Sequence, residues 1–315
     1  MTLVGLLAAY ALTLLVAGPA LLNKTSMLNH APRWAVAAWL SAIGSALFSL
    51  GIVVMLTLVE IGGHWALSRA GIVSCIQGLQ NVIVGRSGTL PQLLAIALSA
   101  VVLAGLGAVV LRLGRGLKRM LDRADDHASG VRLVGRRMDG DIVVVDAVEP
   151  AAYCVAGRAP TIVVTSAAIA ALDGDELAAV LSHERAHLRG RHALVIAVIR
   201  GLAAVLPMVA LLRAAAARVP TLLEMCADDV AVRVHGRGAL LSGLLAISQA
   251  SERRGVGLAA AEVSVLARAE RLASPRSQLT AAGSSAVLSG TVAMMVAGPL
   301  TVAVVATIGA LWCVR

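Results

Sequence analysis

The sequence predicts a mainly α-helical membrane protein with four transmembrane helices and one charged α+β domain. Hydrophobic residues make up 58% of the 315 residues, charged residues make up only 14%, and the mean hydropathy is +0.85. Soluble domains carry about 25% charged residues. Of the 27 basic and 18 acidic residues, all but six lie between residues 112 and 276. This composition excludes a disordered chain and a basic nucleic-acid-binding arm.

Four uncharged apolar runs are long enough to cross a bilayer, which requires about 20 helical residues. They cover residues 3–22, 35–59, 92–111 and 286–312. Because no basic residue precedes the first run, we expect a retained anchor, with a cleaved signal peptide as the alternative.

Basic residues predict the orientation of these spans. Lys24 and Arg33 follow the first span, and a cluster from Arg112 to Arg123 follows the third. Since loops rich in Lys and Arg face the cytoplasm, we expect both termini and loop 61–91 outside a bacterial plasma membrane and the charged segment inside. The predicted units are a three-helix transmembrane module (1–113), a cytoplasmic domain (114–276), and a linker with the last helix (277–315).

Short β-branched runs between residues 131 and 166 predict a small antiparallel sheet. The runs are Arg132–Val134, Ile142–Val145, Tyr153–Val155 and Thr161–Val164. Asp173 then supplies a helix N-cap before an acidic first turn, which predicts a helix over the residues that follow.

That helix carries an HExxH pattern formed by His183, Glu184 and His187. Positions four apart share one helix face, so both histidines can bind one Zn²⁺ while Glu184 takes a proton from the attacking water. The alternative is a solvated face with two neutral histidines. A metzincin would place a third histidine six residues after His187, but that position is Ala193, and His192 is one residue short and rotated about 100° away.

Carboxylates downstream supply the third zinc ligand that a catalytic site needs. Glu224 and Asp228 are four residues apart in an apolar helical segment, whereas Asp229 is expected to face solvent. We assign Glu224 to the metal and Asp228 to a hydrogen bond with a ligand histidine, which fixes its tautomer. A structural zinc site would need a fourth ligand, but Cys226 points about 200° away from Glu224.

The apolar run 193–212 lies between the two halves of this site and contains Arg200 and Pro207. If it crossed the bilayer, His187 and Glu224 would lie on opposite sides and could not share a metal. The interval is too short for two crossings of about 20 residues each. We therefore expect a buried or re-entrant helical element at the membrane face.

Together, the HExxH pattern, the E-x-x-x-D pattern of Glu224 and Asp228, and the four spans resemble the BlaR/MecR-type antirepressor metallopeptidases, which are membrane gluzincins. The resemblance implies zinc held by His183, His187 and Glu224, with Glu184 as the catalytic base. It also implies signal transduction in antibiotic resistance regulation, by cleavage of a cytoplasmic repressor protein, often after self-cleavage. Such an enzyme contacts the lipid bilayer but has no direct contact with nucleic acid.

One departure from that family concerns the sensor. No S-x-x-K motif is present, because the positions three before Lys24 and Lys118 are Leu21 and Arg115. Covalent sensing of a β-lactam by this polypeptide is therefore not expected, and a signal would arrive through loop 61–91, the spans or a separate sensor protein. The sequence leaves a homodimer open.

Further predictions concern residues outside the metal-binding patterns. His235, with Arg233 and Arg237 as alternatives, is a candidate for stabilising the oxyanion. Arg253 and Arg254 form a candidate self-processing point. Cys75 and Cys313 both fall on the outer side, where a disulfide is permitted, and free thiols are the alternative.

Two other functions fit the same sequence. One is a membrane quality-control protease of the HtpX or CaaX-protease kind, against which the short 193–223 interval argues. The other is a non-catalytic membrane signalling scaffold with a structural zinc site.

Overall fold

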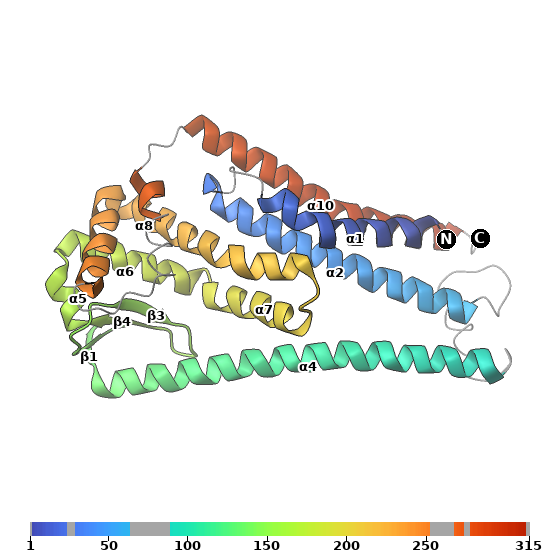
Figure 1. The fold of residues 1–315 in the computed structure, drawn as a ribbon, viewed down its shortest axis with the longest axis horizontal. Coiled ribbons are helices and arrows are strands. Elements are labelled where there is room, and N and C mark those ends of the chain that lie inside the picture. Colours follow the sequence, from blue (N-terminus) through green and yellow to red (C-terminus); the bar gives the residue numbers. More distant parts are fainter. Residues whose placement is uncertain (1, 24–28, 64–88, 253–267, 274–277, 313–315) are drawn as a thin grey trace.

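The computed structural model describes residues 2–23, 29–63, 89–252, 268–273 and 278–312. Helices α1 (Thr2–Asn23), α2 (Pro32–Gly63) and α10 (Gln278–Trp312) pack together, and α4 (Thr89–Val134) runs alongside them (Figure 1). The N-terminal end of α1 and the C-terminal end of α10 lie at one end of the molecule, and the sheet lies at the other. The long helices therefore separate the chain ends from the domain that contains the sheet.

Four helical stretches within the described residues are long and apolar enough to cross a membrane. Gly5–Asn23, Pro32–Met55 and Ala282–Thr301 correspond to predicted spans, so the chain is a membrane protein. The fourth stretch is Ala210–Gln249, which we expected in the cytoplasmic domain. Residues 92–111 are helical within α4, and their crossing of the membrane stays a prediction.

A polar contact joins three of the long helices. Pro299 lies inside α10 and has no N–H, so the carbonyl of Met295 lacks its usual helical donor. The Ser45 hydroxyl donates to that carbonyl at 2.7 Å, and the Tyr10 hydroxyl donates to it at 3.2 Å. Because an unsatisfied carbonyl is costly in lipid, these hydroxyls of α2 and α1 stabilise the packing of α10.

The sheet contains four strands in the order β1-β2-β4-β3. The central pair β2–β4 is parallel, so the predicted antiparallel sheet is wrong at this pair, and the sheet is mixed. A parallel pair requires a crossover, and the chain between β2 and β4 supplies it by adding β3 antiparallel at the outer edge. The strands are β1 (Arg136–Asp139), β2 (Ile142–Val145), β3 (Ala152–Val155) and β4 (Thr161–Thr165).

The first predicted strand, Arg132–Val134, is instead the end of helix α4. The helix stops at Gly135, whose N–H donates to the Val131 carbonyl at 2.8 Å. A Cβ on Gly135 would lie 2.4 Å from a side-chain atom of Val143, so only glycine allows α4 to approach the sheet this closely. The β1 strand begins at the next residue.

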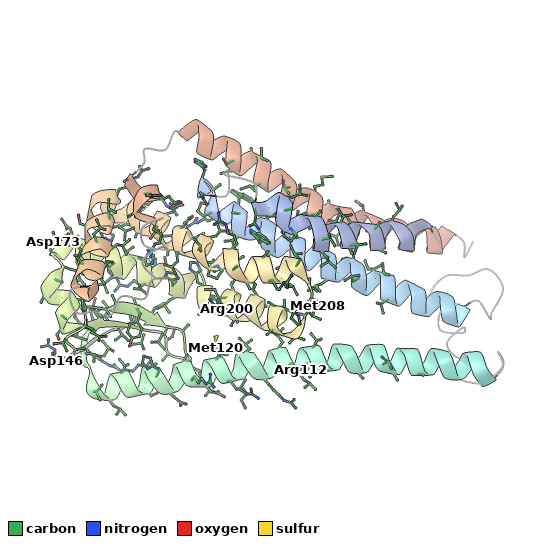
Figure 2. All side chains as sticks on the ribbon, in the orientation of Figure 1. Arg112, Met120, Asp146, Asp173, Arg200 and Met208 are labelled. Atoms are coloured by element: carbon green, nitrogen blue, oxygen red, sulfur yellow. The ribbon has the colours of Figure 1, made fainter. Side chains whose placement is uncertain are left out.

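The chain continues directly after the sheet with helices α5 (Ser166–Ala171), α6 (Gly174–Arg189), α7 (His192–Val205) and α8 (Ala210–Glu252). Helix α7 and the first part of α8 form a hairpin whose turn, Leu206–Val209, contains Pro207. Met208 at this turn is 90% exposed and lies near the level of Arg112 along the long axis, far from Asp173 (Figure 2). The 193–212 run is therefore broken by a turn and does not carry Glu224 away from His187.

A buried apolar cluster holds this hairpin against the long helices. Trp39 of α2 is fully buried in it, together with Ile199 of α7 and Leu211 of α8. Further along, α8 bends at Gly236, where φ is 84°, a value that glycine adopts without strain. The bend lets the last part of α8 pack over α6, where Gly243 approaches Val180.

Candidate metal centre

Helix α6 is fixed at its start by a capping box. The Asp173 carboxylate accepts from the Glu176 N–H at 2.8 Å, and the Glu176 carboxylate accepts from the Asp173 N–H at 3.0 Å. This confirms the predicted N-cap and is worth about 1 kcal/mol. It sets where the helix begins, and therefore which face carries His183 and His187.

Helix α8 crosses that face and brings Glu224 to both histidines. The Glu224 carboxylate lies 3.4 Å from Nε2 of His183 and 3.4 Å from Nε2 of His187. The two Nε2 atoms are 3.1 Å apart. The three predicted ligands thus converge, and their ligand atoms lie within 4.8 Å of one another.

These separations fit a zinc ion. Tetrahedral ligands at about 2.0–2.1 Å from Zn²⁺ lie about 3.3 Å from each other, close to the three observed separations. Two imidazoles and one carboxylate are also one of the ligand sets found in catalytic zinc sites. The chemistry and spacing of the donors therefore match Zn²⁺ held by His183, His187 and Glu224.

Asp228 lies one turn after Glu224 and is completely buried. Its carboxylate is 3.1 Å from Nδ1 of His183, although the contact is too bent to count as a hydrogen bond. This placement is the one we predicted for an orienting carboxylate.

Arg268 is a member of the site that sequence reasoning missed. Its side chain is almost fully buried, and it donates to both Asp228 oxygens, at 2.6 and 3.0 Å. Another nitrogen of the guanidinium lies 3.2 Å from the Glu224 carboxylate. Burial alone would lower the pKa of Arg268, but the hydrogen bonds and charge of Asp228 outweigh it and raise that pKa. A permanent positive charge therefore lies beside the ligands.

Asp229 is also paired, contrary to our expectation that it faces solvent. Arg271 donates to its two carboxylate oxygens at 2.9 and 3.0 Å and to the Asn29 carbonyl at 3.0 Å. Arg268 and Arg271 are three residues apart in the helical segment 268–273, so they lie on one face of it. The two ion pairs anchor that segment on α8.

Glu184, the predicted base, is half-buried next to the predicted ligands. Burial raises the pKa of Glu184, while the charges of His183 and His187 act in the opposite direction. Cys154 on β3 forms a hydrogen bond with it, and burial raises the pKa of that thiol to about 12, so Cys154 is a neutral donor. A carboxyl with a raised pKa is suited to exchanging protons.

A cavity of about 360 Å³ opens beside these groups. One wall is strand β3, an edge of the sheet, and another is formed by Leu244 and Ile247 from the last part of α8. The imidazole, carboxylate and guanidinium groups of the cavity come from α6, α8 and the segment 268–273: His183, Glu184, His187, Glu224 and Arg268.

Other residues singled out from the sequence lie away from this cavity. Among the described residues that line it, neither His235 nor its alternatives Arg233 and Arg237 are present. Cys226 is buried in the apolar cluster of the long helices, where it is not placed to close the metal site. Four residues lie outside the described residues: Cys75, Cys313, Arg253 and Arg254.

An HExxH helix, a carboxylate on a second helix and helices long enough to span a membrane together define a membrane metalloprotease. Residues 117–255 match Peptidase family M48, which indicates a metallopeptidase domain. The match begins in α4 and ends just after α8, so it includes the sheet, the HExxH helix and Glu224. No curated protein matches the chain.

Proposed function

We propose that this protein is a zinc-dependent endopeptidase of the membrane whose catalytic domain faces the cytoplasm. The observation that carries the proposal is the convergence of His183, His187 and Glu224 beside Glu184 at the wall of one cavity. The orientation follows from the basic residues after the first and third spans.

The residues around the cavity can perform peptide hydrolysis. Zn²⁺ held by the two histidines and Glu224 would supply Lewis acidity toward the scissile carbonyl. Glu184 takes a proton from the water that attacks the carbonyl carbon, and it returns a proton to the amine nitrogen as the C–N bond breaks. Arg268, fixed by Asp228, is the cation best placed to stabilise the developing negative charge on the carbonyl oxygen.

The cavity favours an extended polypeptide as substrate. The outer edge of β3 can pair with a substrate strand, which places its backbone beside Glu184. Val180, Leu244 and Ile247 line the same cavity and suit an apolar side chain next to the cleaved bond. This geometry supports an endopeptidase, since a strand can continue past the site in both directions.

A finer proposal is that the enzyme relays a signal by cleaving a cytoplasmic transcriptional repressor. It rests on the resemblance of the metal patterns and span order to the antirepressor metallopeptidases, and on the short interval between His187 and Glu224. A quality-control protease of the HtpX or CaaX-protease kind is the second candidate, and the match to Peptidase family M48 is compatible with it.

The variant Glu184→Gln tests the catalytic part of the proposal. It removes the base while leaving the three ligands, so we expect hydrolysis of a fluorogenic casein to fall at least about 1,000-fold with bound zinc unchanged. Glu149→Gln, at an exposed position after β2, is the matched control and should keep both properties. Continued cleavage by Glu184→Gln, or no zinc in the wild-type protein, would contradict the proposal.

The same inactive variant separates the two substrate classes. Expressed in the source cell, it retains substrate that it cannot cleave, and mass spectrometry then identifies the bound proteins. A small DNA-binding repressor that accumulates uncleaved would support the antirepressor function. Accumulated membrane proteins without any repressor would support quality control instead.

A further inference from the structure

His192 makes the shortest contact of any imidazole near the metal centre. Its Nδ1 atom lies 2.8 Å from Nδ1 of His187, with the two ring planes at 87°. His192 is only 7% exposed. The other ring nitrogen of His187, Nε2, faces Glu224 and His183. His187 is therefore held between the ligand cluster on one side and His192 on the other.

Only one proton arrangement of this pair is compatible with metal binding. A nitrogen that binds zinc must offer a lone pair, so Nε2 of His187 is unprotonated and its Nδ1 carries the proton. That proton points at Nδ1 of His192, which must then accept it. In the opposite arrangement, His192 donates, Nε2 of His187 carries a proton, and the ligand is lost.

The turn before His192 is shaped to bring its ring back to His187. Helix α6 ends at Arg189, and Arg191 adopts a left-handed conformation with φ 49° and ψ 39°. It has the only positive φ among non-glycine residues in the described part of the chain. Such a conformation costs about 1–2 kcal/mol in a residue with a side chain, so the surrounding structure must hold it.

Gly190 gives the His192 ring the space it occupies. A Cβ at residue 190 would lie 2.4 Å from Nε2 and 2.5 Å from Cδ2 of His192. Arg191 and Gly190 together allow the His192 imidazole to occupy this position.

We propose that His192 is a positioning residue that accepts a hydrogen bond from Nδ1–H of His187 and so presents Nε2 of His187 to zinc. This rests on the proposed metal site. Nothing in the HExxH pattern predicts it, because the helical wheel no longer applies once the helix ends at Arg189. The role differs from that of Asp228, which faces His183 from another helix.

Two substitutions of His192 separate hydrogen bonding from packing. In His192→Asn, the side-chain oxygen can take the place of Nδ1 as acceptor, whereas His192→Phe keeps a ring and removes the acceptor. We expect zinc affinity of the full-length protein in detergent, measured by competition with a chromophoric chelator, to fall about 10–100-fold in the Phe variant. The Asn variant should stay within about threefold of wild type.

Co²⁺ gives a second readout that does not depend on activity. Its visible absorption reports the ligand field, so the bands should change in His192→Phe and return in His192→Asn. His127→Phe, at an exposed histidine on α4, is the matched control and should bind like wild type. If His192→Phe melts early without metal, His192→Leu repeats the test with a smaller side chain.

The outcomes are distinguishable. Equal zinc affinity in wild type and all His192 variants would overturn the inference, and so would equal weakening in the Asn and Phe variants, which would show that only ring packing matters. A wild-type protein that binds no zinc would instead overturn the proposed function on which the inference depends.

Discussion

The two histidines of helix α6 are supported by opposite kinds of chemistry. His183 is 4% exposed and faces a buried ionic pair, Asp228 with Arg268, contributed by residues far along the chain. His187 faces the neutral imidazole of His192, only five residues away. One support is charged and assembled by tertiary folding, and the other is neutral and built into a local turn. We therefore expect that separate substitutions can weaken the support of His183 and the support of His187.

The largest effect should come from breaking the ionic support. Asp228→Asn removes the main partner of the buried Arg268, which keeps only its contact with Glu224, and breaking a buried ion pair typically costs about 3–5 kcal/mol. We expect the free energy of unfolding of the metal-free protein, measured by denaturant titration, to fall by this order. Zinc affinity should fall as well, because His183 loses the carboxylate that orients it.

A double variant separates these two losses. In Asp228→Asn combined with Arg268→Met, the buried positive charge is removed, so stability should recover substantially while zinc affinity stays low. Recovery of both properties would mean that Asp228 serves only to neutralise Arg268. Asp228 would then have no role in orienting His183.

An intermediate effect on the stability of the metal-free protein is expected from pH, with opposite signs for His183 and His192. Burial lowers the pKa of His183, but contacts with Asp228 and Glu224 outweigh it and raise the pKa from 6.5 to about 9. Its contribution to metal-free stability is therefore complete below pH 6.5 and is lost as pH rises through about 9. Burial and the charge of His187 lower the pKa of His192 to about 4. Its contribution is complete above pH 6.5 and is lost as pH falls toward 4.

Each contribution is on the order of 2–3 kcal/mol, and variants should remove them separately. The melting temperature of the metal-free protein should be measured across pH 4–10. Its dependence on pH should weaken on the acid side in His192→Asn and on the alkaline side in Asp228→Asn. If both variants flatten the same side, the two supports do not titrate independently.

Features built from neighbouring residues could be predicted from the sequence, whereas features assembled by tertiary folding were harder to predict. Apolar runs predicted three of the helices that are long enough to cross a membrane, and the HExxH spacing predicted that His183 and His187 share one helix face, because both signals are local. Glu224 was predicted because a carboxylate in an apolar helical segment is unfavourable unless it has a metal or charged partner. Arg268 was missed because it follows Asp228 by forty positions in a polar segment with no periodic pattern, and only folding brings the two together.

The errors in the predicted sheet have a similar origin. Strand runs were located from β-branched residues, but the parallel pairing of β2 with β4 depends on where the crossover places β3, which no local pattern records. The end of α4 was misassigned because Arg132–Val134 looks like a strand in composition. Gly135, which ends that helix, was the residue that marked the correct boundary.

The smallest effect on zinc affinity should come from Gly190→Ala, which acts on the neutral imidazole of His192. The new Cβ would displace the His192 ring without removing its acceptor, so we expect zinc affinity to fall about threefold to tenfold, less than in His192→Phe. Gly130→Ala, in an open part of α4, is the control and should slightly raise stability, because alanine favours helix by up to about 1 kcal/mol. A Gly190→Ala protein with wild-type zinc affinity would show that the ring has room to move and that the strained turn at Arg191 has another cause.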